Sequence, residues 1–130
     1  MIINNKVMFI IYVENQERSK DFYQKILNLN PSLDVPGMTE FELTKDTSLG
    51  IMPGDGIVRV LDNKISNANR IKDIPKCELY LFVDNPDECY IRAIEAGGLG
   101  VSKGTKRNWG DYVAYCIDLD SNIIAFAKRE

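Results

Sequence analysis

The chain has 130 residues, of which 45% are hydrophobic and 27% are charged. This composition is typical of one globular domain and excludes disordered and collagen-like chains. No run of about 18 apolar residues occurs, so the sequence predicts no membrane-spanning helix. The first residues also lack the apolar core of a signal peptide. We therefore expect a cytoplasmic protein with no membrane partner.

Charge and residue types narrow the classes of function further. The net charge is −3, and the basic residues are scattered. Nucleic-acid binding depends on a basic surface that neutralises phosphates, so we expect no nucleic-acid partner. Histidine is absent, which removes the commonest metal ligand and the commonest general base at neutral pH. The three cysteines lack a CxxC spacing and are typical of small buried residues in a reducing compartment.

The first half of the chain predicts a strand, a helix and two short strands. The apolar, β-branched run over 7–13 is typical of a buried strand. Asn15 provides an N-cap for a helix over 16–27, whose apolar residues recur at helical spacing. Two short strands over 41–43 and 49–52 follow, separated by a polar turn.

The second half repeats this order after a polar segment. Residues 55–75 predict a linker with one short helical turn. A strand over 78–83 is followed by an Asn-Pro-Asp-Glu helix start and a helix over 88–96. Two further strands are expected over 112–117 and 122–127.

The repeat of about 60 residues decides the expected fold class. The sequence predicts a single α+β domain built of two βαβββ modules. Module one covers about 5–54 and module two about 76–130, with the linker over about 55–75 between them. Pooled strands would form a curved mixed sheet around a cup, with the helices on the outer face. The cup is where we expect a ligand pocket.

Several segments carry a resemblance to a known family. The segment 13–23 joins a strand end, a polar turn and a helix with Phe-Tyr, and the segment 82–87 is a second turn of this kind. Asp118 to Ile124 is a degraded Asp-Pro-Asp-Gly-Asn turn, and Trp109-Gly110 precedes the strand before it. In this order the segments resemble the glyoxalase/bleomycin-resistance/dioxygenase (vicinal oxygen chelate) superfamily, in particular its bleomycin-resistance-like members. The resemblance implies the two-module fold, a small-molecule ligand and a homodimer.

Metal-using members of that superfamily hold a divalent ion with four cup-facing side chains. Carried over by position, these fall on Met8, Ile51, Glu78 and Ala125. Only Glu78 can bind a hard cation, whereas zinc needs three or four N, S or carboxylate ligands. We therefore expect neither a metal nor another cofactor, with a divalent metal as the alternative.

Strand alternation predicts which other side chains face the cup. Their rings suit a planar or cationic ligand; the alternative is that they fill the cup or an interface. The expected ligand-binding residues are Met8, Tyr12, Ile51, Glu78, Tyr80, Trp109 and Tyr115, and the remaining lining consists of Ile10, Leu49, Phe82, Val113, Ala125 and Ala127. A glycine-punctuated loop carries Lys103, Lys106 and Arg107. The equivalent loop borders the cup in relatives, so these three side chains could contact an anionic ligand or stay solvated.

Three functions are compatible with this pattern. The first is a metal-free protein that binds a drug or metabolite in the cup. The second is a lyase or isomerase of the lactoylglutathione lyase-like type, with Glu78 as general base or with displaced metal ligands. The third is a structural or regulatory subunit whose cup serves as an interface. The sequence favours the first and does not name the ligand.

Overall fold

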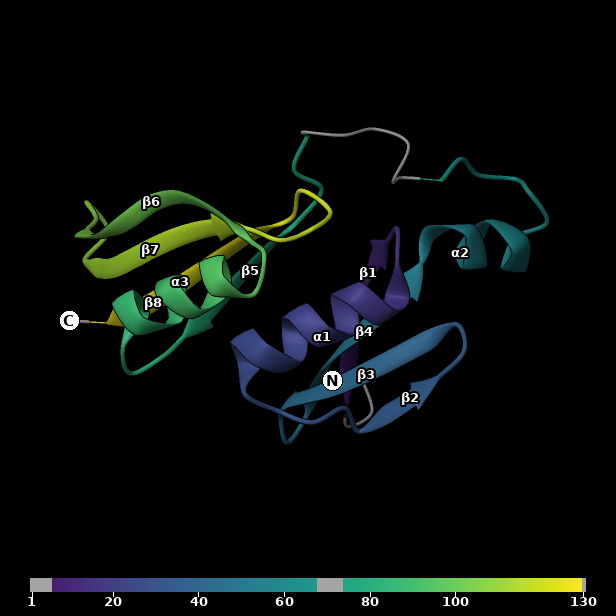
Figure 1. Cartoon of the computed structure of the whole chain (residues 1–130), viewed down its shortest axis with the longest axis horizontal. Helices are drawn as coiled ribbons and strands as arrows, with labels where there is room; N and C mark the ends of the chain where they lie inside the picture. Colours follow the sequence, from purple (N-terminus) through teal and green to yellow (C-terminus); the bar gives the residue numbers. More distant parts are fainter. Residues whose placement is uncertain (1–5, 68–73, 130) are drawn as a thin grey trace. The chain divides into compact units, whose positions relative to one another are not determined.

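The computed structural model describes residues 6–67 and 74–129. The chain divides into two compact units, residues 1–71 and 72–130 (Figure 1). Each unit contains a four-stranded mixed sheet, and three helices accompany the two sheets. The expected α+β class with two similar modules is therefore confirmed. Each unit is described by itself.

Unit 1 has two helices and one sheet. Its strand order is β1-β4-β3-β2, with β1 parallel to β4 and the other neighbours antiparallel. The elements are β1 (Val7–Val13), α1 (Gln16–Leu27), β2 (Leu33–Val35), β3 (Met38–Thr44), β4 (Thr47–Pro53) and α2 (Gly54–Val60). The helical turn expected in the linker is α2, and residues 68–73 of that linker lie outside the described ranges.

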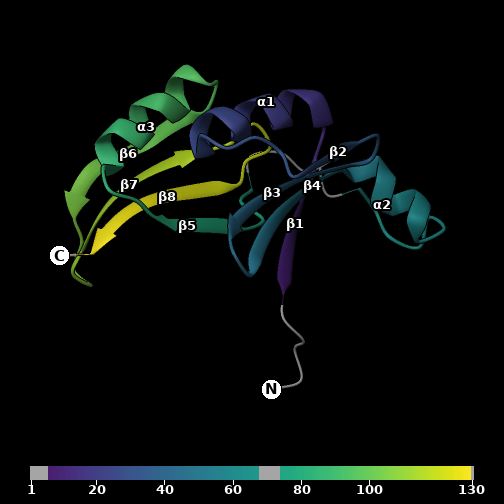
Figure 2. The ribbon, with the colours of Figure 1, turned by 90° about the horizontal axis from the view of Figure 1, so that it is seen from below.

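Helix α1 begins and ends where its capping residues allow. The Asn15 side chain accepts a hydrogen bond from the Arg18 backbone N–H at 3.0 Å. At the other end Asn28 takes a left-handed conformation with φ 53°. The helix buries Phe22 and Tyr23 and lies along one face of its sheet (Figure 2).

The register of β4 corrects one prediction for the cup. Ile51 pairs with Ile11, whereas Met8 pairs with Ser48, so Leu49 and Ile51 do not share the face of Met8. Both are fully buried. The prediction that they line the cup is wrong, because alternation places Leu49 and Ile51 together without indicating which face they take, and a slip of one residue exchanges the faces.

Unit 2 has one helix and one sheet. The strand order is β5-β8-β7-β6, with β5 parallel to β8 and the other neighbours antiparallel. Asn85 caps the helix by accepting a hydrogen bond from the Glu88 backbone N–H at 3.2 Å. The elements are β5 (Glu78–Phe82), α3 (Pro86–Glu95), β6 (Leu99–Lys106), β7 (Asp111–Ile117) and β8 (Ile123–Arg129).

Strand β6 occupies most of the segment that we expected to be a glycine-rich loop. Its glycines lie where the α3 side of the unit crowds the sheet. A Cβ at Gly100 would collide with Tyr90 of α3, and one at Gly104 would collide with Asp87 and Tyr112. The glycines are therefore a packing requirement of this strand and not a sign of a loop.

Candidate functional site

The face of the unit 2 sheet opposite α3 carries most of the predicted ligand-binding residues. Tyr112, whose hydroxyl donates to Asp87 at 2.8 Å, points toward α3. Its neighbours along β7 alternate to the other face. This second face and the turn before β7 we name the aromatic face; it consists of Glu78, Tyr80, Phe82, Arg107, Trp109, Asp111, Val113, Tyr115, Ala125, Ala127 and Arg129.

Small side chains on the central strand separate the large rings of this face. Ala125 on β8 pairs with Tyr80 on one side and Tyr115 on the other. Ala127 pairs with Phe82 and Val113 in the same way. The rings of Tyr80 and Tyr115 pack against the buried cluster of Val113 and the alanines. The strands that carry the two tyrosines are therefore roughly 10 Å apart, two strand spacings.

A chain of hydrogen bonds fixes one side of the aromatic face. The Trp109 indole Nε1–H donates to the Tyr80 hydroxyl oxygen at 3.0 Å. The Tyr80 hydroxyl donates to the buried Asp111 carboxylate at 2.7 Å. Asp111 also pairs with Arg129 at 3.5 Å, and the Arg129 guanidinium lies 4.5 Å from the centre of the Phe82 ring. Desolvation, together with the hydrogen bond to Asp111, raises the pKa of Tyr80, so this hydroxyl stays protonated and remains a donor.

Arg107 lies at the other side of the aromatic face. Its Nη2 donates to the Val113 carbonyl and to the Ser102 hydroxyl, each at 2.8 Å. The guanidinium carbon lies 5.0 Å from the centre of the Tyr115 ring, which is cation–π geometry. Desolvation and the Glu78 carboxylate raise the pKa of Tyr115, and Arg107 acts in the opposite direction. The face thus holds a fixed cation beside a neutral phenol.

Met8 and Tyr12 lie on one face of the unit 1 sheet, and Leu49 and Ile51 lie on the opposite face. Here side chains pack closely over Gly50, since the sulfur atoms of Met8 and Met38 each lie 3.3 Å from the position that a Gly50 Cβ would occupy. The predicted ligand-binding set therefore divides between two units: Met8 and Tyr12 are in unit 1, and the other members apart from Ile51 are on the aromatic face.

The donor chemistry of the inherited chelate positions does not fit a divalent ion. Glu78 lies at the exposed start of β5, with Ile123 as its register partner. Ala125 is on the aromatic face but has no ligand atom, and Ile51 is buried on the opposite face of its own sheet. Residues 6–67 and 74–129 contain no group of three His, Cys, Asp or Glu side chains able to hold a metal.

The model of the glyoxalase-like domain family matches residues 6–129 of the chain. The chain belongs to the glyoxalase-like family. A glyoxalase-related enzyme from Fulvimarina pelagi is similar in structure, with a TM-score of 0.80 at 16% identity, over 98% of this chain and 89% of that one. A glyoxalase/bleomycin resistance protein/dioxygenase family enzyme from Burkholderia phytofirmans PsJN also gives a TM-score of 0.80 at 16% identity, over 95% and 97% of the chains.

A hypothetical protein from S. aureus gives a TM-score of 0.77 at 21% identity, over 97% of this chain and 94% of that one. At these identities the likeness shows the glyoxalase-like fold alone. A sequence search of curated proteins gives no match. No helix in the two described ranges of this glyoxalase-like chain is long and apolar enough to cross a membrane.

Two members of the aromatic face of this glyoxalase-like chain, Asp111 and Arg129, were not predicted from the sequence. Asp111 anchors Tyr80, and Arg129 pairs with Asp111. Strand alternation alone predicts that both lie on this face, because Asp111 is two residues before Val113 and Arg129 is two residues after Ala127. Arg107, which was expected to contact an anionic ligand or to stay solvated, is half-buried on the aromatic face, and the ligand contact stays a prediction.

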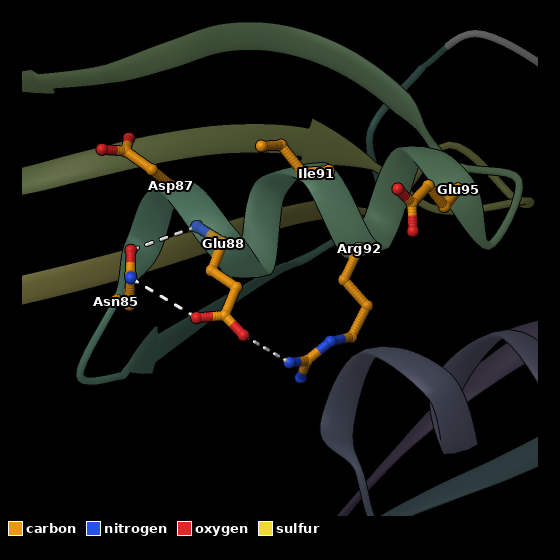
Figure 3. A pocket seen from close by; sticks show the side chains of 6 residues that line it. All are labelled: Asn85, Asp87, Glu88, Ile91, Arg92 and Glu95. Atoms are coloured by element: carbon orange, nitrogen blue, oxygen red, sulfur yellow. Dashed lines mark hydrogen bonds and ion pairs between the residues drawn. The ribbon is translucent and has the colours of Figure 1, made fainter.

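A surface hollow of the glyoxalase-like fold lies on α3, away from the aromatic face (Figure 3). Its lining is mostly charged, and Asp87, Glu88 and Arg92 already have partners. Glu88 pairs with Arg92 at 3.1 Å and contacts Asn85, while Asp87 accepts from Tyr112. Small-molecule sites are mostly apolar with a few converging polar groups. The hollow is therefore a solvated helix surface, lined by Asn85, Asp87, Glu88, Ile91, Arg92 and Glu95.

Proposed function

We propose that this glyoxalase-like protein binds a planar small molecule on the aromatic face and needs no metal to do so. The carrying observation is the hydrogen-bond chain from Trp109 through Tyr80 to Asp111, which holds two aromatic side chains on an open sheet face. Trp109 and Phe82 remain 56% and 55% exposed. Trp109 is therefore an exposed ring held in place by Tyr80 and is available to stack on a ligand.

The energetics support binding by rings on this face. An aromatic pair contributes about 0.5–1.5 kcal/mol beyond the area that it buries. Because Tyr80 and Trp109 are already fixed by hydrogen bonds, a ligand loses less free energy in ordering them. The alanines beneath the rings are fully buried, so the aromatic side chains themselves provide the contact surface.

The single tryptophan makes the test direct. Trp109 is the only tryptophan of the chain, so its indole N–H gives one resonance in a heteronuclear NMR spectrum. We would titrate the protein with naphthalene-2-carboxamide, a neutral planar probe, and follow that resonance. Binding should shift it, and Tyr115→Ala should weaken the binding. Ile91→Ala, at an exposed position on α3, is the matched control.

Two results would count against the proposal. The aromatic face would not be the site if the naphthalene carboxamide and its charged analogues all left the indole resonance unmoved. The lyase or isomerase alternative would lead if elemental analysis found stoichiometric zinc, nickel or manganese that Glu78→Ala removes. Thermal-shift titration with the same ions is the companion measurement.

We also propose that the protein is a homodimer. Strand β1 is an edge of its sheet and exposes apolar side chains, with Phe9 at 60% and Met8 at 41%. Exposed apolar edges are normally covered by another chain or element. Light scattering on a size-exclusion column should give twice the 14.8 kDa chain mass, and a monomer at micromolar concentration would refute the proposal. A cytoplasmic location stays an expectation.

A further inference from the structure

Arg107 is a fixed cation without a nearby acidic partner. Its Nη2 donates to Val113 O and Ser102 Oγ, and a third acceptor is the Lys103 carbonyl at 3.4 Å. All three acceptors are neutral. Among residues 6–67 and 74–129, no ion pair within 4.0 Å involves this guanidinium. The charge is thus oriented but not neutralised by a direct contact.

One nitrogen of this guanidinium also lacks a hydrogen-bond acceptor. Arg107 Nε is enclosed and has no partner among the described residues. Buried N–H groups are nearly always paired with protein, water or a bound ion, so an exception needs an explanation. Nη2 already uses both of its N–H groups on Val113 O and Ser102 Oγ, so Nε is the donor left for an anionic oxygen such as that of a carboxylate. Tyr115, whose ring centre lies 5.0 Å from the guanidinium carbon, is only half-buried.

The other charges of the aromatic face do not offer an equivalent site. Asp111 already accepts from Tyr80 and pairs with Arg129. Arg129 is therefore partly neutralised, and its side chain is 75% exposed. Glu78 lies at the exposed start of β5, where water competes for it. Arg107 is the charge of this face that is both oriented and without a close counter-ion.

We infer that the ligand of the aromatic face is a planar acid whose carboxylate binds Arg107 while its ring stacks beside Tyr115. This inference rests on the proposed function and specifies the ligand class of the same site. A guanidinium with a free N–H recognises a carboxylate by charge and by geometry together. A cationic ligand would instead place a positive group beside Arg107 and depend on the solvated Glu78.

Three probes that share one ring system test the inference: naphthalene-2-carboxylate, naphthalene-2-carboxamide and trimethyl(naphthalen-2-ylmethyl)ammonium. Dissociation constants would come from the Trp109 indole resonance and from calorimetry. We expect the carboxylate to bind about tenfold or more tightly than the carboxamide, since a hydrogen bond to a charged group is stronger than a neutral one. We expect the ammonium probe to bind most weakly.

Two variants assign the preference to named residues. Arg107→Lys keeps the charge but loses the Nε donor and the Nη2 bonds that orient the guanidinium, so it should remove most of the preference for the carboxylate over the carboxamide. Glu78→Gln, at an exposed position, should tighten carboxylate binding by about two- to fivefold, because it removes a like charge from the same face. Carboxamide binding should change less than carboxylate binding in Glu78→Gln. Retained thermal stability shows that each variant is folded.

The outcomes separate this inference from the proposed function. If the carboxylate and carboxamide bind equally and Arg107→Lys changes neither, the inference fails and the planar site stands. If the ammonium probe binds best and Glu78→Gln weakens it, the ligand is cationic and the inference is again wrong. If none of the three probes moves the Trp109 resonance, the proposed function itself fails.

Discussion

The hydrogen bond from Tyr80 to Asp111 should contribute measurably to the stability of unit 2. Tyr80→Phe removes the hydroxyl and leaves a buried carboxylate oxygen without its 2.7 Å donor. An unsatisfied buried polar group costs about 1–3 kcal/mol. We expect the free energy of unfolding to fall by about 2 kcal/mol, and the midpoint of thermal unfolding by roughly 8 °C for a domain of this size. Circular dichroism melts measure both.

A double-mutant cycle tests the coupling between these two residues. Asp111→Asn keeps an acceptor but loses the charge, so alone it should cost about 1 kcal/mol. In the Tyr80→Phe background the same change removes the unpaired carboxylate, and the double variant should be no less stable than Tyr80→Phe. Simple additivity of the two losses would refute the argument, because it would mean that the pair does not interact.

The raised pKa of Tyr80 adds a pH signature to the same experiment. Above about pH 10 the unfolded chain loses the tyrosine proton while the folded chain keeps it. The folded state then binds more protons than the unfolded state, so stability falls as the pH rises from about 10 toward the folded pKa. This contribution is complete below pH 10. The alkaline loss should be smaller in Tyr80→Phe, and an unchanged loss would contradict the assignment.

The remaining predictions concern unit 2. Gly100→Ala should destabilise it by about 1–3 kcal/mol, because the added methyl collides with Tyr90; an unaltered urea midpoint would contradict that packing. Asn85→Ala should cost about 1 kcal/mol in the same assay by removing the α3 cap, and a smaller loss in Asn85→Ser would confirm the capping role. Burial raises the pKa of Cys116 to about 12. A thiol reagent at pH 8 should therefore label exposed Cys77 first and Cys116 only when the protein unfolds. Early labelling of Cys116 would contradict this prediction, because it would mean that the core is open.

The sequence predicted the order of the major elements because their signals are local. The two N-cap asparagines, Asn15 and Asn85, each hold the backbone N–H that their position implies. Strand β6 was missed because its glycines are required by the approach of the α3 side of the unit, which no local pattern of β6 reveals. The face predicted for Ile51 was wrong for a similar reason, since the pairing of β4 with β1 determines which face this residue takes.

The candidate site was predictable to the extent that strand alternation determines it. Tyr80, Tyr115 and Glu78 fall on one face of unit 2, as their spacing indicates. The bond between Trp109 and Tyr80 depends on the turn before β7, whose Gly110 has φ 102°, and a turn conformation is not fixed by periodicity. The position of Arg107 over Tyr115 depends on the same turn.

The chemistry of Arg107 bears on the choice between a binding protein and an enzyme. A divalent ion in an active site polarises a bound oxygen as a Lewis acid. Arg107 supplies a positive charge that can hold an oxyanion but has no vacant orbital to polarise it. The Tyr80 hydroxyl, whose pKa is raised by desolvation and by its bond to Asp111, keeps its proton and already donates it to the Asp111 carboxylate. A face with a fixed cation and a committed phenol can retain a planar acid, and of its described residues Glu78, at the exposed start of β5, is the carboxylate left as a base for a lyase reaction.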